Sequence, residues 1–179
     1  MTDLTFALAG NPNAGKTTIF NLLTGLHQHT GNWPGKTVEK KEGEIEHNGA
    51  TIKIVDLPGA YSLTAYSPEE LIARDFIIEE LPDVVINVVD ASNLERNLYL
   101  TVQILELDVP VVLALNMMDD LKNNGGRIDT ERLSQLLGDV PVIGTMANKG
   151  RGIPELIRQA VETSKRARKP GDFREMKNA

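Results

Sequence analysis

Residues 10–17 have the sequence Gly10-Asn11-Pro12-Asn13-Ala14-Gly15-Lys16-Thr17. A glycine, four residues and then Gly-Lys-Ser/Thr is the spacing of a nucleotide phosphate-binding loop. The apolar run 4–9 before it predicts a buried strand, and the apolar spacing of 18–23 after it predicts a helix. The segment therefore predicts a strand, a phosphate-binding loop and a helix; a glycine-rich turn is the alternative.

The residue types in this loop suit a phosphate group with a magnesium ion. Glycines let the backbone approach an anion closely, and successive N–H groups face it together with the start of the helix. Lysine adds a positive charge, and a threonine hydroxyl can ligate Mg²⁺. The residues predicted to contact nucleotide here are Gly10, Asn13, Ala14, Gly15, Lys16, Thr17 and Thr18.

A second motif, Asn116-Met117-Met118-Asp119, follows the apolar run 110–115, which predicts a buried parallel strand. The Asp119 carboxylate can accept hydrogen bonds from both N1–H and N2–H of guanine, a pair of donors that adenine lacks. The Asn116 amide can serve the O6/N7 edge of the base. Asn-x-x-Asp is also a common turn at a strand end, so the guanine prediction depends on the phosphate loop in the same chain.

A third motif, Asp56-Leu57-Pro58-Gly59, ends the alternating strand pattern of 50–55. Asp56 can hold Mg²⁺ through a water molecule, and the Gly59 N–H can meet a γ-phosphate with no side chain in the way. Asp-x-Pro-Gly alone is also a good turn. The order of the three motifs favours a nucleotide switch.

Composition indicates a single globular domain. The chain has 179 residues, 41% hydrophobic and 25% charged, and no cysteine, so it can bury a core without disulfides. The net charge of -6 and the pI near 5.1 argue against a broad nucleic-acid-binding surface. No apolar run approaches the roughly 20 residues of a membrane helix, and no N-terminal signal sequence is evident.

Strand and helix patterns alternate along the chain, which predicts an α/β fold with a mostly parallel sheet of six or seven strands and helices on both faces. The pair Asn48-Gly49 predicts a hairpin and hence one antiparallel edge strand. We expect further strands at 84–90, 109–116 and 140–143, and helices at 94–107, 129–137 and 153–166. The predicted domain spans 1–169, and 170–179 form a polar tail.

Two segments between the motifs have their own patterns. The region 27–41 contains Gly31, Pro34, Gly35 and the only tryptophan, and it predicts a long mobile loop. Its Trp33 is interpreted either as a loop anchor or as part of a site. Further on, Ser67-Pro68 followed by two glutamates predicts the start of a helix.

The chain resembles the cytosolic G domain of the FeoB ferrous iron transport proteins. The resemblance rests on the phosphate loop, on Thr30-Gly31-Asn32-Trp33-Pro34-Gly35-Lys36-Thr37-Val38-Glu39, on Asp56 to Leu63 with Tyr66-Ser67-Pro68-Glu69-Glu70, and on Asn116-Met117-Met118-Asp119, where Met117 replaces the usual lysine. It covers roughly the first 165 residues and implies a Ras-like P-loop GTPase fold.

The resemblance also implies metal sites. It makes 27–41 the first switch, with Thr37 as a Mg²⁺ ligand beside Thr17 and Asp56. It implies a K⁺ site formed by the Asn13 side chain and the backbone carbonyls of Gly31 and Trp33. The alternative for Asn13 is a turn-former after Pro12.

Catalysis is expected to differ from that of glutamine-using GTPases, because Ala60, Tyr61 and Ser62 follow Gly59 and none of them is a glutamine. The attacking water is expected on backbone groups near Thr37 and Gly59. The predicted catalytic residues are Lys16, Thr37, Gly59 and Asn13. The last base-contacting loop is predicted at Thr145, Met146 and Ala147, with the Ala147 N–H directed at O6.

The function implied by the resemblance is Mg²⁺-dependent, K⁺-stimulated GTP hydrolysis to GDP that regulates or drives ferrous iron uptake. The implied partners are a helical domain and a membrane permease, neither of which is in this sequence, and oligomers are possible. The resemblance places the domain on the cytoplasmic side of the inner membrane, and the chain itself is predicted to be soluble. The alternative is a free-standing GTP-dependent switch acting on an RNA or ribosome-associated partner.

Overall fold

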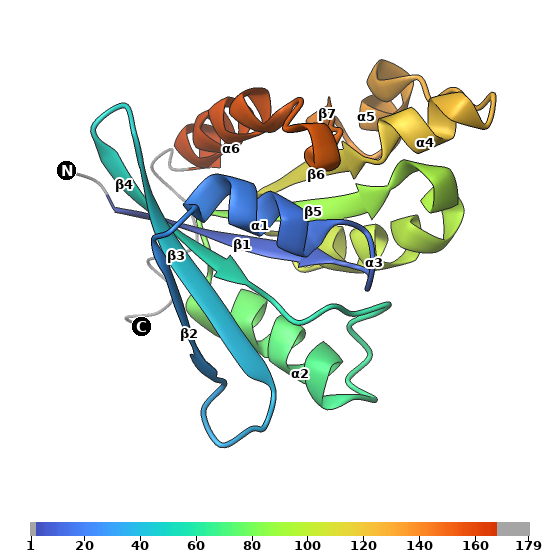
Figure 1. The fold of residues 1–179 in the computed structure, drawn as a ribbon. Coiled ribbons are helices and arrows are strands. Elements are labelled where there is room, and N and C mark those ends of the chain that lie inside the picture. The colour runs from blue at the N-terminus through green and yellow to red at the C-terminus, as the bar shows by residue number, and fades with distance from the viewer. Residues whose placement is uncertain (1–2, 168–179) are drawn as a thin grey trace.

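A computed structural model describes residues 3–167, which form one seven-stranded sheet in the order β2-β3-β4-β1-β5-β6-β7 (Figure 1). The predicted α/β class and strand number are confirmed. The strands are β1 (Leu4–Gly10), β2 (Gln28–Asn32), β3 (Glu39–His47), β4 (Ala50–Asp56), β5 (Val84–Asp90), β6 (Val111–Asn116) and β7 (Val142–Gly144).

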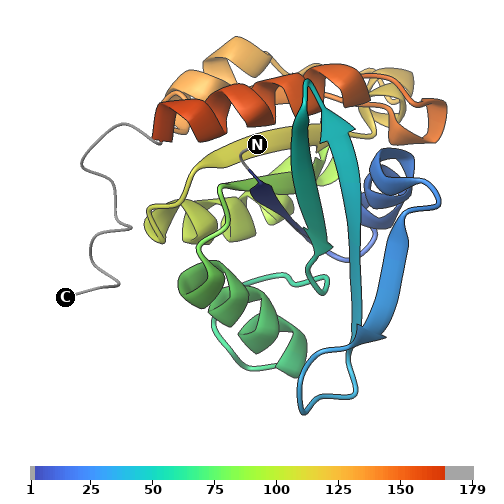
Figure 2. The same ribbon diagram turned by 90° about the vertical axis from the view of Figure 1, so that its left-hand side faces the viewer.

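Helices cover both faces of the sheet, as Figures 1 and 2 show. On one face α1 and α6 pack over Phe6 and Leu8, and on the other α2 and α3 pack over Ala7 and Ala9. Alternate residues of a strand point to opposite faces, so β1 contributes to both cores. The helices are α1 (Lys16–Thr24), α2 (Pro68–Asp75) with its π-helical continuation η1 (Phe76–Glu80), η2 (Ala91–Asn93), α3 (Leu94–Glu106), α4 (Met118–Asn123), α5 (Thr130–Leu136), η3 (Ala147–Lys149) and α6 (Ile153–Ala167).

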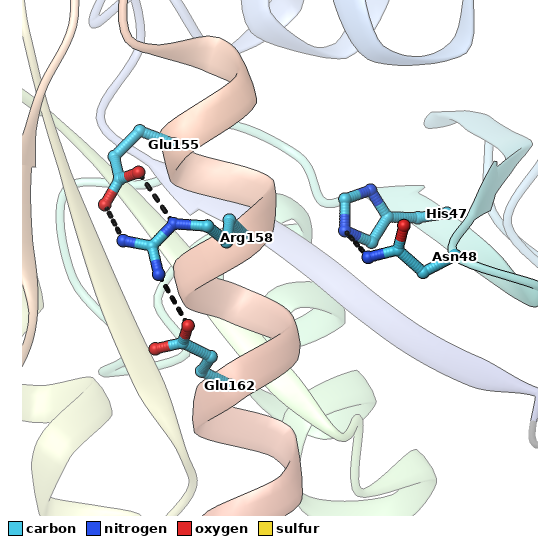
Figure 3. Close-up of polar contacts among 5 residues, drawn as sticks. All are labelled: His47, Asn48, Glu155, Arg158 and Glu162. Carbon is cyan, nitrogen blue, oxygen red and sulfur yellow. Dashed lines mark hydrogen bonds and ion pairs between the residues drawn. The ribbon is translucent and has the colours of Figure 1, made fainter.

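The strand that runs against all the others is β3, as the hairpin signal predicted. It pairs antiparallel with β4 through a turn in which Asn48 and Gly49 have φ of 50° and 77°. Two positive φ values give a turn whose twist matches the two strands. Beside it, the Asn48 side chain lies 3.2 Å from Nε2 of His47 (Figure 3).

The prediction of a continuous loop at 27–41 was wrong, because β2 occupies part of it. Gln28–Asn32 pairs antiparallel with residues 39–43 of β3 and forms an edge of the sheet. The strand is largely exposed and polar, so it has none of the apolar alternation by which a strand is predicted. The observed loop is therefore only the short turn between β2 and β3.

The chain crosses close to itself where β3 passes the end of α1. A Cβ at Gly43 would lie 2.6 Å from both the His27 carbonyl oxygen and the Thr24 side chain. Contacts this short do not occur for real Cβ atoms, so only glycine fits at this position. This close packing fixes where the β2–β3 hairpin leaves the body of the domain.

The last described element, α6, buries Leu156, Ile157 and Ala160 against the sheet. On its outer face Arg158 pairs with Glu155 and Glu162, one turn to either side (Figure 3). The predicted tail 170–179 lies outside the described residues. Between residues 3 and 167, no helix has the length and apolar character needed to span a membrane.

Candidate nucleotide-binding site

The predicted motifs meet at one edge of the sheet. The phosphate loop follows β1, Asp56 ends β4, Asn116 ends β6, and the segment 145–147 follows β7. These four strands run parallel, so their carboxyl ends lie together, at the edge where ligands bind in such folds. The fold thus brings together segments that are more than one hundred residues apart in the sequence.

Close contacts explain why Gly10 and Gly15 of the phosphate loop have no side chain. Gly15 has a φ of 93°, and a Cβ there would lie 2.1 Å from Nδ2 of Asn116. At Gly10 a Cβ would lie 2.6 Å from the Val88 carbonyl oxygen. Between them, Asn13 has a φ of 66° and an exposed side chain, and asparagine is one of the few residues that tolerate this conformation. Gly10 and Gly15 are therefore required by close contacts, and asparagine suits the backbone conformation at position 13.

Lys16 and Asp56 form a buried ion pair between their Nζ and Oδ1 atoms. Burial raises the pKa of Asp56, and the positive charge of Lys16 opposes that rise. The next residue, Thr17, is exposed at the start of α1. The lysine predicted to bind phosphate and the carboxylate predicted to hold Mg²⁺, 40 residues apart in sequence, are therefore in direct contact.

Asn116 joins two loops as a brace through the hydrogen bonds of its side-chain amide. Its Nδ2 donates to the Ala14 carbonyl at 3.0 Å, and its Oδ1 accepts from Oγ1 of Thr145 at 3.1 Å and from the Ala147 N–H at 3.0 Å. The sequence predicted that the Asn116 amide and the Ala147 N–H contact guanine. In this structure they bond to each other, and they join the phosphate loop to the segment after β7.

Asp119 lies just past this brace, at the start of α4. Its Oδ2 accepts from Nζ of Lys149 at 3.0 Å and from Nδ2 of Asn148 at 3.3 Å. These bonds, the one from Lys149 above all, lower the pKa of Asp119. Met117, with a φ of 60°, turns the chain from β6 into α4. Sequence reasoning missed Lys149 and Asn148, since a lysine in a glycine-containing loop has no motif of its own.

The segment after Asp56 packs directly on the phosphate loop. The Ala60 N–H donates to the Gly10 carbonyl at 3.1 Å. A Cβ at Gly59 would lie 3.3 Å from Pro12, which leaves little space for any side chain there. Gly59 thus lies beside the phosphate loop.

Beyond Gly59 the chain is held by α2 and α3. The Leu63 N–H donates to Oε1 of Gln103 at 2.7 Å, and Arg96 lies 4.4 Å from the centre of the Tyr61 ring. The Glu70 carboxylate accepts from the Tyr66 N–H at 3.0 Å. The predicted helix start is confirmed, because the Glu70 N–H donates to Oγ of the N-cap Ser67 at 3.1 Å, with Pro68 as the first helical residue.

The residues predicted to form the first switch, Gly31, Trp33 and Thr37, lie at the end of the β2–β3 hairpin. Figures 1 and 2 show this end of the hairpin next to α2 and away from the start of α1, the helix that follows the phosphate loop. Trp33 is 8% exposed and packs edge to face on Phe76, with ring centres 5.7 Å apart. Its carbonyl accepts from the Lys36 N–H at 2.9 Å. The structure favours the loop-anchor interpretation of Trp33.

The hairpin turn and α2 border a cavity of about 460 Å³. Its wall combines the Trp33 and Phe76 rings with charged side chains of both signs, among them Lys36 and Asp75. Nε1 of Trp33 is buried and has no hydrogen-bond partner in the part of the chain that the structure describes. The end of the hairpin thus contacts η1 through packing of aromatic rings, while hydrogen bonds join the phosphate loop to the segment after β7.

A Ras-like sheet order, a glycine-constrained phosphate loop and an Asn-x-x-Asp segment braced to that loop define a P-loop GTPase domain. Comparison with known proteins gives its family. The family model for ferrous iron transport protein B matches residues 4–160. The chain therefore belongs to the FeoB ferrous iron transport family.

Individual members of the FeoB family are also similar to this chain over most of its length. A Porphyromonas gingivalis Fe(2+) transport protein A/Fe(2+) transporter FeoB fusion protein is 54% identical over 152 residues, covering 84% of this chain and 18% of that protein. The FeoB G-domain structure from Methanococcus jannaschii is 52% identical with a TM-score of 0.82, covering 92% of this chain and 99% of that one.

A cytosolic-domain structure of the T. maritima FeoB iron transporter in a GDP form is 44% identical with a TM-score of 0.89. It covers 96% of this chain and 66% of that one. The chain spans about a fifth of the length of the curated relatives that it matches. The comparisons fit the iron-transport interpretation and do not fit the RNA- or ribosome-associated alternative.

Proposed function

We propose that this chain binds GTP and GDP, hydrolyses GTP, and regulates or drives ferrous iron uptake through a membrane permease. The brace at Asn116, three residues before Asp119, carries the proposal. It ties the phosphate loop at Ala14 to the loop at Ala147, so phosphate-binding and base-reading groups are held in one frame. The GDP form of the T. maritima relative supports a guanine nucleotide at this edge.

In this proposal each part of the frame has a separate task. The N–H groups of the phosphate loop, from Gly10 and Asn13 to Thr18, surround the phosphates, and the Lys16 ammonium moves from Asp56 to a phosphate oxygen. Asp119 selects guanine through N1–H and N2–H. The edge of the guanine base lies along the segment Thr145, Met146 and Ala147. The face of the guanine ring lies beside Met117.

The Thr17 hydroxyl and the Asp56 carboxylate are the oxygen groups proposed to bind Mg²⁺. Thr17 offers an exposed hydroxyl, and the Asp56 carboxylate is held close by through its contact with Lys16. Hydroxyl and carboxylate oxygens are the ligands that Mg²⁺ prefers. Thr37 completes the proposed set once the β2–β3 hairpin reaches the nucleotide. A bound Mg²⁺ neutralises charge on the β- and γ-phosphates.

K⁺ is proposed on the outer side of the loop. The Asn13 side chain is exposed there, and its oxygen is a suitable ligand, with the carbonyls of Gly31 and Trp33 as further ligands. No glutamine follows Gly59, so a monovalent cation beside the phosphates supplies charge stabilisation that the chain otherwise lacks. This arrangement requires the hairpin to leave α2, because Trp33 packs there in the structure.

Hydrolysis itself is proposed to depend mainly on position and charge. The Gly59 N–H and the backbone near Thr37 hold the attacking water, and Lys16 stabilises the charge on the transferred phosphoryl group. Asn13 contributes through K⁺. Because the hairpin must move first, we expect modest turnover in the isolated domain.

The role in iron uptake is proposed from family membership. The matching relatives are named Fe(2+) transporters and are about five times longer than this chain. We propose that the domain works on the cytoplasmic side of the inner membrane, next to a helical domain and a permease, and that self-association modulates it. Nucleotide-driven movement of the hairpin is the proposed signal to those partners.

Calorimetric titration with GDP, GTP, ADP and ATP, followed by phosphate release in KCl, tests this function. Guanine nucleotides should bind with Mg²⁺, and adenine nucleotides should not. GTP turnover should be faster in KCl than in NaCl. Equal binding of ADP and GDP would contradict the base assignment, and no phosphate release in KCl would contradict the enzymatic one.

A further inference from the structure

We propose that Lys149 gates entry of the guanine base, because its ammonium holds the Asp119 oxygen that the base must use. The inference rests on the proposed guanine binding and adds a residue that controls its rate. Lys149 belongs to neither the phosphate loop nor the base motifs. Its place in the structure alone assigns it this task.

The geometry makes Lys149 a competitor of the base. Nζ of Lys149 and Nδ2 of Asn148 both contact Oδ2 of Asp119, at 3.0 and 3.3 Å. Guanine presents N1–H and N2–H side by side, and such a pair engages both oxygens of one carboxylate. Each carboxylate oxygen has about two lone-pair sites, and Lys149 and Asn148 together supply two donors to Oδ2. A guanine donor at the same oxygen therefore competes with these two donors.

Lys149, the charged and closer of the two donors, can leave without disturbing the loop. Its side chain is 52% exposed and ends a flexible stem, whereas that of Asp119 is 11% exposed. The loop backbone is fixed independently, by the Ala147 N–H on Asn116 and by the Lys149 N–H on the Met146 carbonyl at 2.9 Å. The gate is therefore a side-chain movement, and the backbone frame for the base remains.

The size of the effect follows from the exposure of the lysine. Ion pairs between exposed side chains contribute little, and salt weakens them further. Removing the Lys149 ammonium should therefore raise the association rate constant of GDP by about two- to fivefold at low ionic strength. The gain should shrink as KCl is added, because salt already opens the pair in the wild type.

The test compares Lys149→Met with Lys122→Met by stopped flow, using a fluorescent GDP analogue. Lys122 is an exposed lysine of α4, three residues after Asp119, and no ion pair joins it to that carboxylate among the described residues. Loss of either positive charge weakens steering of an anionic nucleotide, which slows association. Only release of Asp119 makes association faster, so the two variants should change in opposite directions.

The expected result is faster association for Lys149→Met, slower association for Lys122→Met, and an unchanged dissociation rate constant for Lys149→Met. In an Asp119→Asn background, Lys149→Met should give no acceleration of xanthine nucleotide binding. Slower association in Lys149→Met, or faster dissociation at unchanged association, would overturn the gate. If the wild type itself binds no GDP, the proposed function fails instead.

Discussion

The base side of the site, formed by Asn116, Asp119 and the segment 145–147, is joined to the phosphate loop by hydrogen bonds. The end of the β2–β3 hairpin packs on η1 instead. At the base side, Asn116 bonds to Ala14, Thr145 and Ala147, so loops from three parts of the chain support one another. Among the described residues, the hairpin has no such bonds to the phosphate loop, and its Trp33 packs on Phe76 of η1. The loops proposed to recognise a nucleotide are already joined to one another, while the residues proposed for catalysis on the hairpin pack against η1.

This difference separates binding from hydrolysis in physical terms. A frame whose backbone is already assembled keeps the ordering cost of nucleotide binding small, which favours affinity. The proposed K⁺ and Mg²⁺ ligands on the hairpin join only after Trp33 leaves its contact, so part of the binding free energy is used for that movement. Substitutions on the two sides should therefore affect different measurements.

Gly15→Ala should reduce nucleotide affinity more than any other substitution, because the new Cβ would displace the Asn116 side chain. A Cβ there would lie 2.1 Å from Asn116, at a φ of 93°. We expect GDP affinity to fall by about 100-fold or more, as both strain and the lost brace oppose binding. Gly125→Ala is the control, since Gly125 has a φ of 77° and a Cβ there would meet nothing within 4 Å. Equal losses in both variants would show that backbone strain alone is responsible.

Asn116→Ala should come next, since it leaves three partners without their hydrogen bonds. Each buried polar group left unpaired costs about 1–3 kcal/mol, so we expect the three together to lower the free energy of unfolding by at least about 3 kcal/mol. Urea denaturation measures it. Thr145→Val removes only one of the three bonds and should cost about 1 kcal/mol. A neutral Asn116→Ala variant would contradict the brace.

Asn13→Ala should slow GTP hydrolysis without changing GDP affinity, because Asn13 is proposed to share a K⁺ ion with the hairpin. We expect its turnover in KCl to fall by about 10- to 100-fold, to the level in NaCl, with GDP affinity within about twofold of the wild type. Phosphate release in the two salts measures the first quantity, and calorimetry the second. If turnover of the wild type is already equal in KCl and NaCl, Asn13 has no cation to hold and acts as a turn-former.

Phe76→Leu should have a smaller effect in the opposite direction. Leucine keeps an apolar side chain at this position but loses the edge-to-face contact with Trp33, which contributes about 0.5–1.5 kcal/mol. Turnover in KCl should rise by about two- to fivefold, and the fluorescence of the only tryptophan should shift to the red. Tyr66→Leu, at a residue 93% exposed, is the control. Slower turnover in Phe76→Leu would mean that the contact supports catalysis.

Sequence alone predicted the strands and helices whose apolar pattern is strong, such as β5 and α3, and it predicted the motifs at the sheet edge. It missed β2, because a polar edge strand depends on its ladder with β3 and leaves no periodic pattern. The partners of Asn116 could not be predicted, since one of them is 102 residues away.

The position of Trp33 could not be predicted either. A single aromatic residue in a polar segment fits a core contact and a ligand-binding loop equally well, and only the packing on Phe76 distinguishes them. Lys149 was missed for a related reason. Its pairing with Asp119 follows from how the loop 145–152 closes, which no local residue pattern encodes.

The most direct test of the central claim, that Asp119 reads guanine in a preassembled frame, is a titration of Asp119→Asn with GDP and XDP. Xanthine carries a carbonyl where guanine carries its 2-amino group, so an amide can pair with it while a carboxylate is repelled. We expect the wild type to bind GDP and the variant to bind XDP, each in preference to the other nucleotide. Retention of GDP preference by Asp119→Asn would contradict it.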